Sequence, residues 1–272
     1  MRTGSLQSWV DQQMIRGRYI FTKEDVLAQG LSQADDSLNT ALSRLGKKGV
    51  IVSPWQNFYV VVPTEYRLKG NVPPSLYIDH LMKSLGRDYY VSLLSAAALN
   101  GAGHQRAMAF QVTVNGAPIH SGIKNGVRLD FTLRNPLPMM YVKQVKTQMG
   151  FINVSSPELT ALDLVLNENK VGGLSRVTEV LIELAENMHF DESFTDLLTF
   201  FNAPVIQRLG YLLDLIEEHE LADRLLMLAQ KQSKLFRKIR LKQSKTQTDD
   251  MVIDSRWKVI VNQEIEADED SL

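Results

Sequence analysis

The spacing of apolar residues in the first 75 residues changes once, from a helical period to short strand-like runs. Within 6–14, 21–30 and 32–45 the apolar positions follow the three-to-four-residue spacing of amphipathic helices. Ser5, Thr22 and Ser32 stand at N-cap positions, and an acid follows the latter two three residues later, as in a capping box. From Gly49 onward, two β-branched and aromatic runs flank 53–57. The segment therefore predicts three helices followed by a hairpin.

This order of elements is that of a winged helix, in which residues 30–32 form the turn between the second and third helices. A DNA-recognition helix needs short polar groups for base edges and cations for phosphates. The third predicted helix presents such a face opposite its apolar stripe. It comprises Ser37, Thr40, Arg44 and Lys47, flanked by Asn39, Ser43 and Lys48. We predict that this face contacts DNA; the alternative is an ordinary solvated helix face.

Two features qualify this prediction. Asp35 and Asp36 oppose DNA contact at the start of the third helix, although they complement its dipole. The tip of the predicted wing, formed by Trp55, Gln56 and Asn57, is a weaker contact site, because its tryptophan could equally pack on the domain.

A turn-rich linker, LKGNVPPS at 68–75, divides the chain into a winged-helix domain at 1–70 and a second domain at 76–272. In the second domain we predict helices at 75–85 and 89–103, period-two strands between 108 and 150, helices from 156 onward and a last strand at 258–261. The fold class is α+β: an N-terminal winged helix-turn-helix domain, then a larger mixed α/β domain with a small sheet and several helices.

Charge is segregated along the chain. The total is −1, yet residues 1–160 carry a net +7 and the remainder −8. A basic surface for a polyanion is therefore expected in the first half, with an accessory face on the strands. The residues of that accessory face are Arg106, Lys124, Arg128, Arg134, Lys143 and Lys146. These residues could equally be the solvent-facing positions of ordinary strands. For the basic run 231–245 we prefer a solvated helix over a nucleic-acid arm or a toxin contact.

Several classes of function are disfavoured. The chain has no cysteine, which excludes disulfides and thiol chemistry, and its histidines lack the spacing of a metal site. Gly101 and Gly103 lack the rest of a phosphate-binding motif. A nuclease-like pattern, Asp130 with Gln144-Val145-Lys146, lacks the second acid needed to hold a metal. No membrane span or secretory signal is visible. We therefore expect a cytoplasmic protein that is not an enzyme and carries no cofactor or metal.

Several segments, taken in order, resemble one family. They are ALSRLGKKGVI (41–51), YYVSLLSAAALNGAGHQRAMAFQVTV (89–114), FINVSSPELTALDLV (151–165), VIQRLGYLLDLIEE (205–218) and RWKVIVN (256–262). In this order they are similar to the AbiEi-type antitoxins of type IV toxin–antitoxin systems, which act in abortive infection, a phage defence. The resemblance implies a transcriptional autorepressor that binds double-stranded DNA at inverted repeats of its own promoter. It also implies that the protein counteracts a nucleotidyltransferase toxin, directly or indirectly.

Other questions stay open at this stage. The resemblance carries the winged-helix contacts onto Ser37, Asn39, Thr40, Ser43, Arg44, Lys47 and Lys48, but it supplies no residues for antitoxin activity. We expect a monomer or a weak dimer. The alternative function is a protein-interaction module or a degenerate nuclease-like enzyme, whose winged helix would dock a partner rather than DNA.

Overall fold

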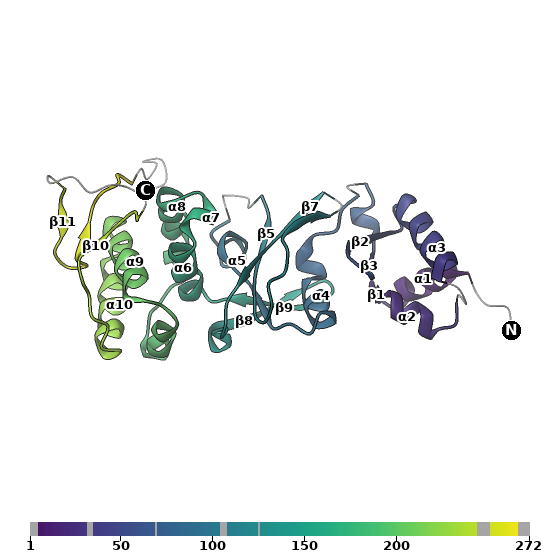
Figure 1. Ribbon diagram of the computed structural model, residues 1–272, viewed down its shortest axis with the longest axis horizontal. Coiled ribbons are helices and arrows are strands. Elements are labelled where there is room, and N and C mark those ends of the chain that lie inside the picture. The colour runs from purple at the N-terminus through teal and green to yellow at the C-terminus, as the bar shows by residue number, and fades with distance from the viewer. Residues whose placement is uncertain are drawn as a thin grey trace.

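The computed structural model describes residues 5–31, 35–68, 70–103, 108–124, 126–243 and 251–265. The chain forms an elongated mixed α/β structure whose parts follow one another along the long axis in chain order (Figure 1). A small helical module lies at the N-terminal end, a six-stranded sheet in the middle, and a helical part with a further small sheet at the other end.

The N-terminal module contains three helices and a three-stranded antiparallel sheet. Its elements are α1 (Leu6–Ile15), β1 (Ile20–Thr22), α2 (Lys23–Ala28), α3 (Asp35–Lys47), β2 (Ile51–Trp55) and β3 (Phe58–Val61). Thr22 and Asp25 form the predicted capping box: each side chain accepts a hydrogen bond from the other's backbone N–H. β1 was not predicted; it pairs with β3 and gives the strand order β1-β3-β2. The predicted cap at Ser32 lies outside the described residues.

The central sheet has the strand order β6-β7-β5-β4-β9-β8. Its strands are β4 (Tyr89–Val91), β5 (Phe110–Val114), β6 (Gly122–Lys124), β7 (Val127–Leu133), β8 (Val142–Thr147) and β9 (Gly150–Ser155). β4 and β5, in the middle, pair antiparallel, while β4–β9 and β5–β7 are parallel pairs. Strands that meet in this sheet are therefore often far apart in the sequence.

Two predictions in this region are wrong. Residues 89–103 do not form one helix: Tyr89–Val91 is the buried strand β4, and only Leu93–Leu99 is helical, as α5. The second error concerns Gly150–Ser155, for which no strand was predicted. These residues form β9, which directly precedes the N-cap of the next helix. All residues of β4 are buried. A short strand buried on both faces shows no alternation of polar and apolar residues, so its sequence cannot be told from a buried helix.

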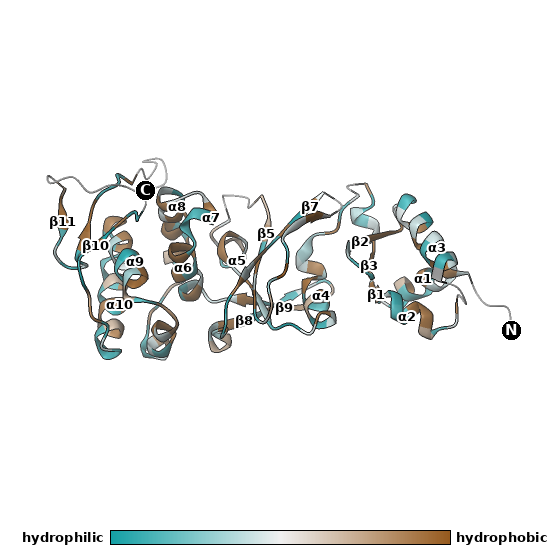
Figure 2. Cartoon of the chain, viewed as in Figure 1, coloured by the Kyte–Doolittle hydropathy of each residue, from teal (hydrophilic) through white to brown (hydrophobic). Residues whose placement is uncertain are grey.

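The two faces of the central sheet belong to two different cores. On one face, Val91 and Val112 pack with α4 (Ile78–Ser84) and also with Phe58 and Val60 of β3. This core therefore extends from the N-terminal module into the sheet. On the other face, Tyr90 packs toward α5 and the helical part. The apolar segments of the central strands and of α5, α6 and α8 are brown in Figure 2.

The helical part is built on one large core. Its elements are α6 (Pro157–Leu166), α7 (Glu168–Val171), α8 (Leu174–Ala185), the 3₁₀ helix η4 (Glu192–Phe200), α9 (Ala203–Leu215) and α10 (His219–Lys231); short 3₁₀ helices η1 (Thr64–Tyr66), η2 (Pro74–Leu76) and η3 (Met139–Tyr141) lie earlier in the chain. Ser156 caps α6 by accepting from the Leu159 N–H, and Pro157 stands in its first turn. Among the described residues, none of the helices combines the length and apolarity that crossing a membrane requires.

A three-stranded sheet closes the C-terminal end: β10 (Ile239–Arg240), β11 (Ile253–Asp254) and β12 (Val259–Ile260), in the order β10-β12-β11. The preferred helix over 231–245 is wrong, because α10 ends at Lys231 and the chain then runs without helix into β10. The side chains after Lys231 are alternately more and less buried, as in an extended chain. Ile239 and Leu241 pack on the core of the helical part, because β10 pairs with β12.

Trp257 anchors this small sheet on α9. It is fully buried, and its indole N–H donates to Oδ2 of Asp214 at 2.6 Å. Its ring lies so close to Gly210 that a Cβ at that position would overlap it. Because Gly210 has no side chain, the Trp257 ring can pack directly on the backbone of α9.

We predict that Gly210→Ala destabilises the protein by about 1–3 kcal/mol, because the added methyl forces the Trp257 ring out of its position. Gly46→Ala in α3 is the matched control: the nearest atom to a Cβ there is the Ile51 carbonyl oxygen, at 4.0 Å. Alanine favours the helix, so this control should be neutral or stabilising by up to about 1 kcal/mol. Urea unfolding followed by circular dichroism measures both. Equal midpoints for the two variants would contradict the proposed contact.

Candidate nucleic-acid interface

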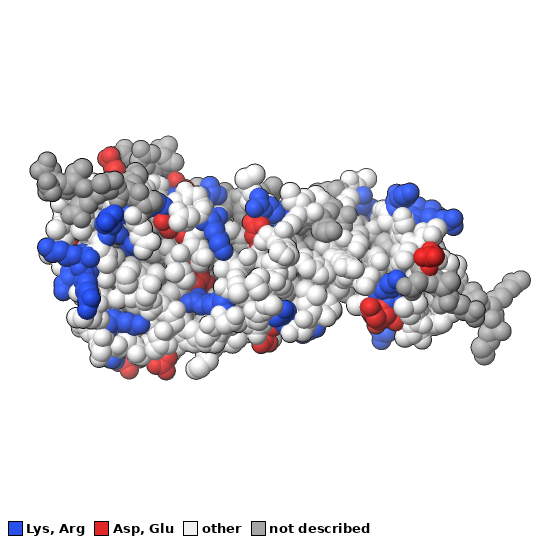
Figure 3. Space-filling model, in the orientation of Figure 1, with Lys and Arg blue, Asp and Glu red and all other residues white. Residues whose placement is uncertain are grey.

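The two faces of α3 differ in burial. Leu38, Leu42 and Leu45 are buried in the core of the N-terminal module, with Val10 and Phe21. This orientation turns the opposite face to solvent. The exposed residues there are Ser37, Asn39, Thr40, Ser43, Arg44 and Lys47, followed by Lys48. The structure therefore brings the predicted recognition residues together on one exposed surface, and basic side chains gather over α3 at the upper right of Figure 3.

Charge is graded along this surface. Arg44 and Lys47 lie in the last turn of α3, where cations interact favourably with the helix dipole. Asp36 is exposed at the other end, and its carbonyl oxygen accepts a hydrogen bond from the Thr40 hydroxyl at 2.8 Å. The side chain of Asp35 lies outside the described residues. The cationic end is therefore the C-terminal half of the helix.

The hairpin tip is placed differently from α3. The ring of Trp55 is half-buried and packs edge-to-face on Phe131 of β7, with 6.0 Å between ring centroids. Gln56 and Asn57 are exposed, and the Asn57 carbonyl accepts from the Lys23 N–H. Trp55 thus joins the N-terminal module to the central sheet, and the polar pair alone extends into solvent at this turn.

The predicted accessory face is not assembled as one surface. Arg128 lies on β7, near one edge of the sheet, whereas Lys143 and Lys146 lie on β8, at the opposite edge. Lys143 and Lys146 are three positions apart on one strand, so their side chains leave opposite faces. Arg106 and the side chain of Lys124 lie outside the described residues. The basic residues in this half therefore form separate patches.

Arg134, the remaining member of that set, is committed to an internal ion pair. Its Nη1 donates to Oδ1 of Asp163 at 2.6 Å, and its Nη2 donates to the Phe200 carbonyl at 2.9 Å. The guanidinium also lies 4.3 Å from the centre of the Phe201 ring. Because both of its terminal nitrogens are paired inside the fold and its side chain is only 13% exposed, Arg134 has a structural role.

One feature of the sequence could have predicted this ion pair: Asp163 stands among the apolar residues of its helix. It lies on the buried face of α6, and its other oxygen accepts from the Tyr90 hydroxyl at 2.8 Å. Burial raises the pKa of Asp163 from its ordinary 3.8 to about 6, although Arg134 and Tyr90 lower it in part. A carboxylate on an apolar helix face indicates a buried cation, but it does not identify which arginine.

The fold also separates the residues of the nuclease-like pattern. Asp130 lies on β7, and Gln144 and Lys146 lie on β8, with β5, β4 and β9 between these strands. A metal-dependent site needs its carboxylates and lysine side by side. Within the described ranges, no three histidine or acidic side chains cluster in a way that could hold a metal ion. The nuclease-like interpretation therefore has no geometric support.

Comparison with known proteins identifies the region that contains the central sheet. Residues 90–215, from β4 to the end of α9, match the family model of the AbiEi antitoxin C-terminal domain. The resemblance to AbiEi-type antitoxins is thereby confirmed over this segment. We call residues 90–215 the AbiEi domain.

The AbiEi domain and its flanking parts also share a fold with a solved structure. The crystal structure of the RV2827C protein from Mycobacterium tuberculosis superimposes with a TM-score of 0.63, covering 92% of this chain and 89% of that one. Sequence identity is 16%, so the comparison shows the fold alone. No curated protein matches this chain.

The raised pKa of Asp163 predicts a pH dependence of stability. Because the folded-state pKa lies above the unfolded value, the native state keeps a proton that the unfolded state releases between about pH 4 and pH 6. The stabilising contribution of this carboxyl is therefore complete below that window and is lost as the pH rises through it. The free energy of unfolding of wild type minus that of Asp163→Asn should fall by at most about 1.4 kcal/mol per pH unit.

Urea titrations at four pH values across this window measure the difference. Asp191→Asn is the control, because hydrogen bonds from Ser193 lower the pKa of Asp191 from its ordinary 3.8. Its contribution is complete above that value and is lost only as the pH falls below it, so the difference for Asp191→Asn should stay constant across this window. A difference for Asp163→Asn that stays constant from pH 4 to pH 7 would mean that this carboxyl remains charged.

Proposed function

We propose that the protein is the antitoxin of a type IV toxin–antitoxin pair and that it represses its own operon. The observation that carries the antitoxin role is the match of residues 90–215 to the AbiEi antitoxin C-terminal domain. The DNA-binding role is supported by the module at 6–61, which we assign as a winged helix from its three helices and its sheet in the order β1-β3-β2.

In the proposed complex, α3 enters the major groove of double-stranded DNA. Cations at its C-terminal end, Arg44, Lys47 and Lys48, neutralise phosphates and supply most of the affinity. The short polar groups of Ser37, Asn39, Thr40 and Ser43 approach base edges and supply sequence preference. Gln56 and Asn57 are the hairpin residues exposed for a flanking contact.

The remaining basic side chains have a secondary role in this proposal. Arg128, Lys143 and Lys146 are exposed, and they raise the local potential without reading the sequence. Residues 161–229 carry a net charge of −9 and face away from DNA or toward another protein. The protein binds inverted repeats as a monomer or a weak dimer, one copy per repeat.

The AbiEi domain counteracts a nucleotidyltransferase toxin, directly or indirectly. Separating this activity from DNA binding by deleting residues 1–70 would disturb the fold, because Phe58 and Val60 share a core with Tyr77 and Val91. Substitutions on the exposed face of α3 in the full-length chain are the cleaner route.

Arg44→Ala should weaken binding to the protein's own promoter by about 1–3 kcal/mol and reduce its preference over unrelated DNA. Lys83→Ala is the control, because it removes from α4 one exposed cation, which forms an ion pair with Asp79 at i−4. Electrophoretic mobility shifts on promoter and scrambled duplexes measure both quantities. Equal affinities for wild type and Arg44→Ala would remove Arg44 from the interface.

Co-expression with an adjacent nucleotidyltransferase gene tests the antitoxin role. We expect the full-length protein to restore growth, and a variant with Arg44→Ala and Lys47→Ala to restore it equally while failing to repress a promoter reporter. Growth arrest despite normal levels of the full-length protein would contradict the antitoxin role. If the variant restores no growth, the two functions share a surface, which contradicts their separation.

A further inference from the structure

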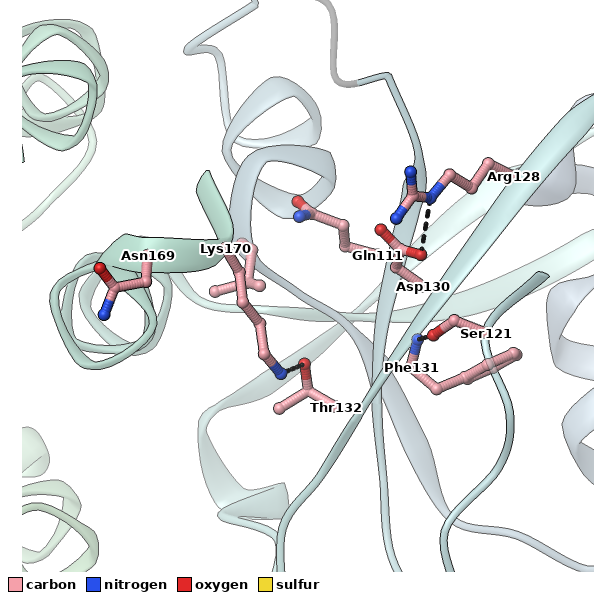
Figure 4. A pocket seen from close by; sticks show the side chains of 9 residues that line it. Gln111, Ser121, Arg128, Asp130, Phe131, Thr132, Asn169 and Lys170 are labelled. Atoms are coloured by element: carbon pink, nitrogen blue, oxygen red, sulfur yellow. Dashed lines mark hydrogen bonds and ion pairs between the residues drawn. The ribbon is translucent and has the colours of Figure 1, made fainter. Parts of the chain in front are cut away.

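A polar cleft lies between the central sheet and α7, away from α3. It consists of two adjoining cavities of about 410 and 430 Å³, which share Gln111, Arg128, Asp130 and Lys170 in their walls. Figure 4 shows these side chains converging from β5 and β7 on one side and from α7 on the other. Each volume falls within the usual range of small-molecule sites.

The sheet register explains why these residues share one face. Gln111 and Asp130 are directly paired across β5 and β7. Arg128 and Thr132 stand two positions before and after Asp130, so the pleat of β7 places all three on the same side. This is the side of the sheet on which α5 and α7 lie, and it is not the side that packs on the N-terminal module.

Gln111 is a buried side chain whose amide forms a hydrogen bond to the described part of the chain through its oxygen only. It is 6% exposed, and its Oε1 accepts a hydrogen bond from the Leu94 N–H at 2.9 Å. Its Nε2 has no hydrogen-bond partner among the described residues, and the amide borders both cavities. The Gln111 Nε2 is not one of the buried unpaired polar atoms of the described residues, so it reaches the water of the cleft and can donate to a ligand there.

The walls carry an excess of positive charge. Three cations, Arg128, Lys170 and Arg176, face one carboxylate, that of Asp130, which already pairs with Arg128 at 3.0 Å. Lys170 donates to the neutral Thr132 hydroxyl at 2.9 Å, and Arg176 makes no hydrogen bond or ion pair within the described chain. Two cations therefore lack a counter-ion, which matches the charge of a phosphate group.

The rest of the lining suits a sugar and an apolar ring. Asp130, Ser121 and Thr132 offer a carboxylate and two hydroxyls, the groups that bind ribose hydroxyls. The second cavity adds the apolar side chains of Leu94, Ala109 and Val171. Leu93, at the cleft, has φ of +53°, a strained conformation of the kind found at ligand sites.

We propose that this cleft binds a nucleoside phosphate. Lys170 and Arg176 hold the phosphate together with Arg128, Asp130 accepts from the ribose hydroxyls, and the Gln111 amide donates to an acceptor on the base. The inference uses only residues of the cleft and is independent of DNA binding through α3 and of the antitoxin role.

Isothermal titration of the full-length protein with AMP, GMP, CMP, UMP, ribose 5-phosphate and inorganic phosphate tests the site. At least one nucleotide should bind about tenfold more tightly than ribose 5-phosphate and inorganic phosphate, which lack the base. Lys170→Gln and Arg176→Gln should each weaken that nucleotide about fivefold or more. Lys143→Gln, which removes an exposed lysine from the opposite side of the sheet, should leave the Kd unchanged.

Gln111→Leu separates binding of the phosphate by the cations from recognition of the base. It keeps all three cations, so affinity for inorganic phosphate should persist while the preference among the four nucleotides falls. Thermal melts establish that each variant is folded; if Gln111→Leu is unfolded, the Lys170 and Arg176 variants still decide the outcome.

Four results would overturn the proposal. The first is no binding of any probe at millimolar concentration. The second is equal affinity for inorganic phosphate and for every nucleotide, which would indicate an adventitious ion only. The third is a loss with Lys143→Gln as large as with Lys170→Gln. Binding of single-stranded oligonucleotides without any mononucleotide would also reject it, because the cleft would then hold a strand.

Discussion

The ion pair between Arg134 and Asp163 connects the central sheet to the helical part. Arg134 follows β7, Asp163 lies on α6, and Tyr90 on β4 binds the same carboxylate. The guanidinium also holds the end of η4 through the Phe200 carbonyl. Removing either side chain would leave its partner buried and unpaired, a change that typically destabilises a protein by about 3–5 kcal/mol. The contact thus joins β4, the end of β7 and the end of η4 to α6, and α7 follows α6 directly in the chain.

A second constraint joins the N-terminal module to the sheet. Phe58 and Val60 of β3 lie in the same core as Val91 and Val112, and Trp55 packs on Phe131. The hairpin predicted as a wing thus also packs on the central sheet, through the tryptophan at its tip. This arrangement leaves α3 as the surface of the module that carries aligned polar and cationic groups, while the cleft lies on the opposite face of the sheet. DNA and a small ligand would therefore occupy separate surfaces of one chain.

Much of the N-terminal module was predictable from the sequence. The box of Thr22 and Asp25 and the stripe of Leu38, Leu42 and Leu45 are local patterns, and each has the expected contacts. Prediction failed for β4, β9 and the run after Lys231. In these segments burial or pairing with a distant strand outweighs local preference. The cleft had no sequence signal, because Gln111, Asp130 and Lys170 come from three separate elements.

The sequence by itself determined the helices of the N-terminal module, the caps at Ser5 and Thr22, the polar face of α3 and the family resemblance, which residues 90–215 bear out. These features depend on residues a few positions apart, where spacing and side-chain type carry the information. Only the tertiary structure decided which strands are neighbours. That choice placed Arg134 against Asp163, separated Arg128 from Lys146, and brought Gln111 opposite Asp130. Alternation along a strand shows which residues share a face, but it contains no information about the partner strand.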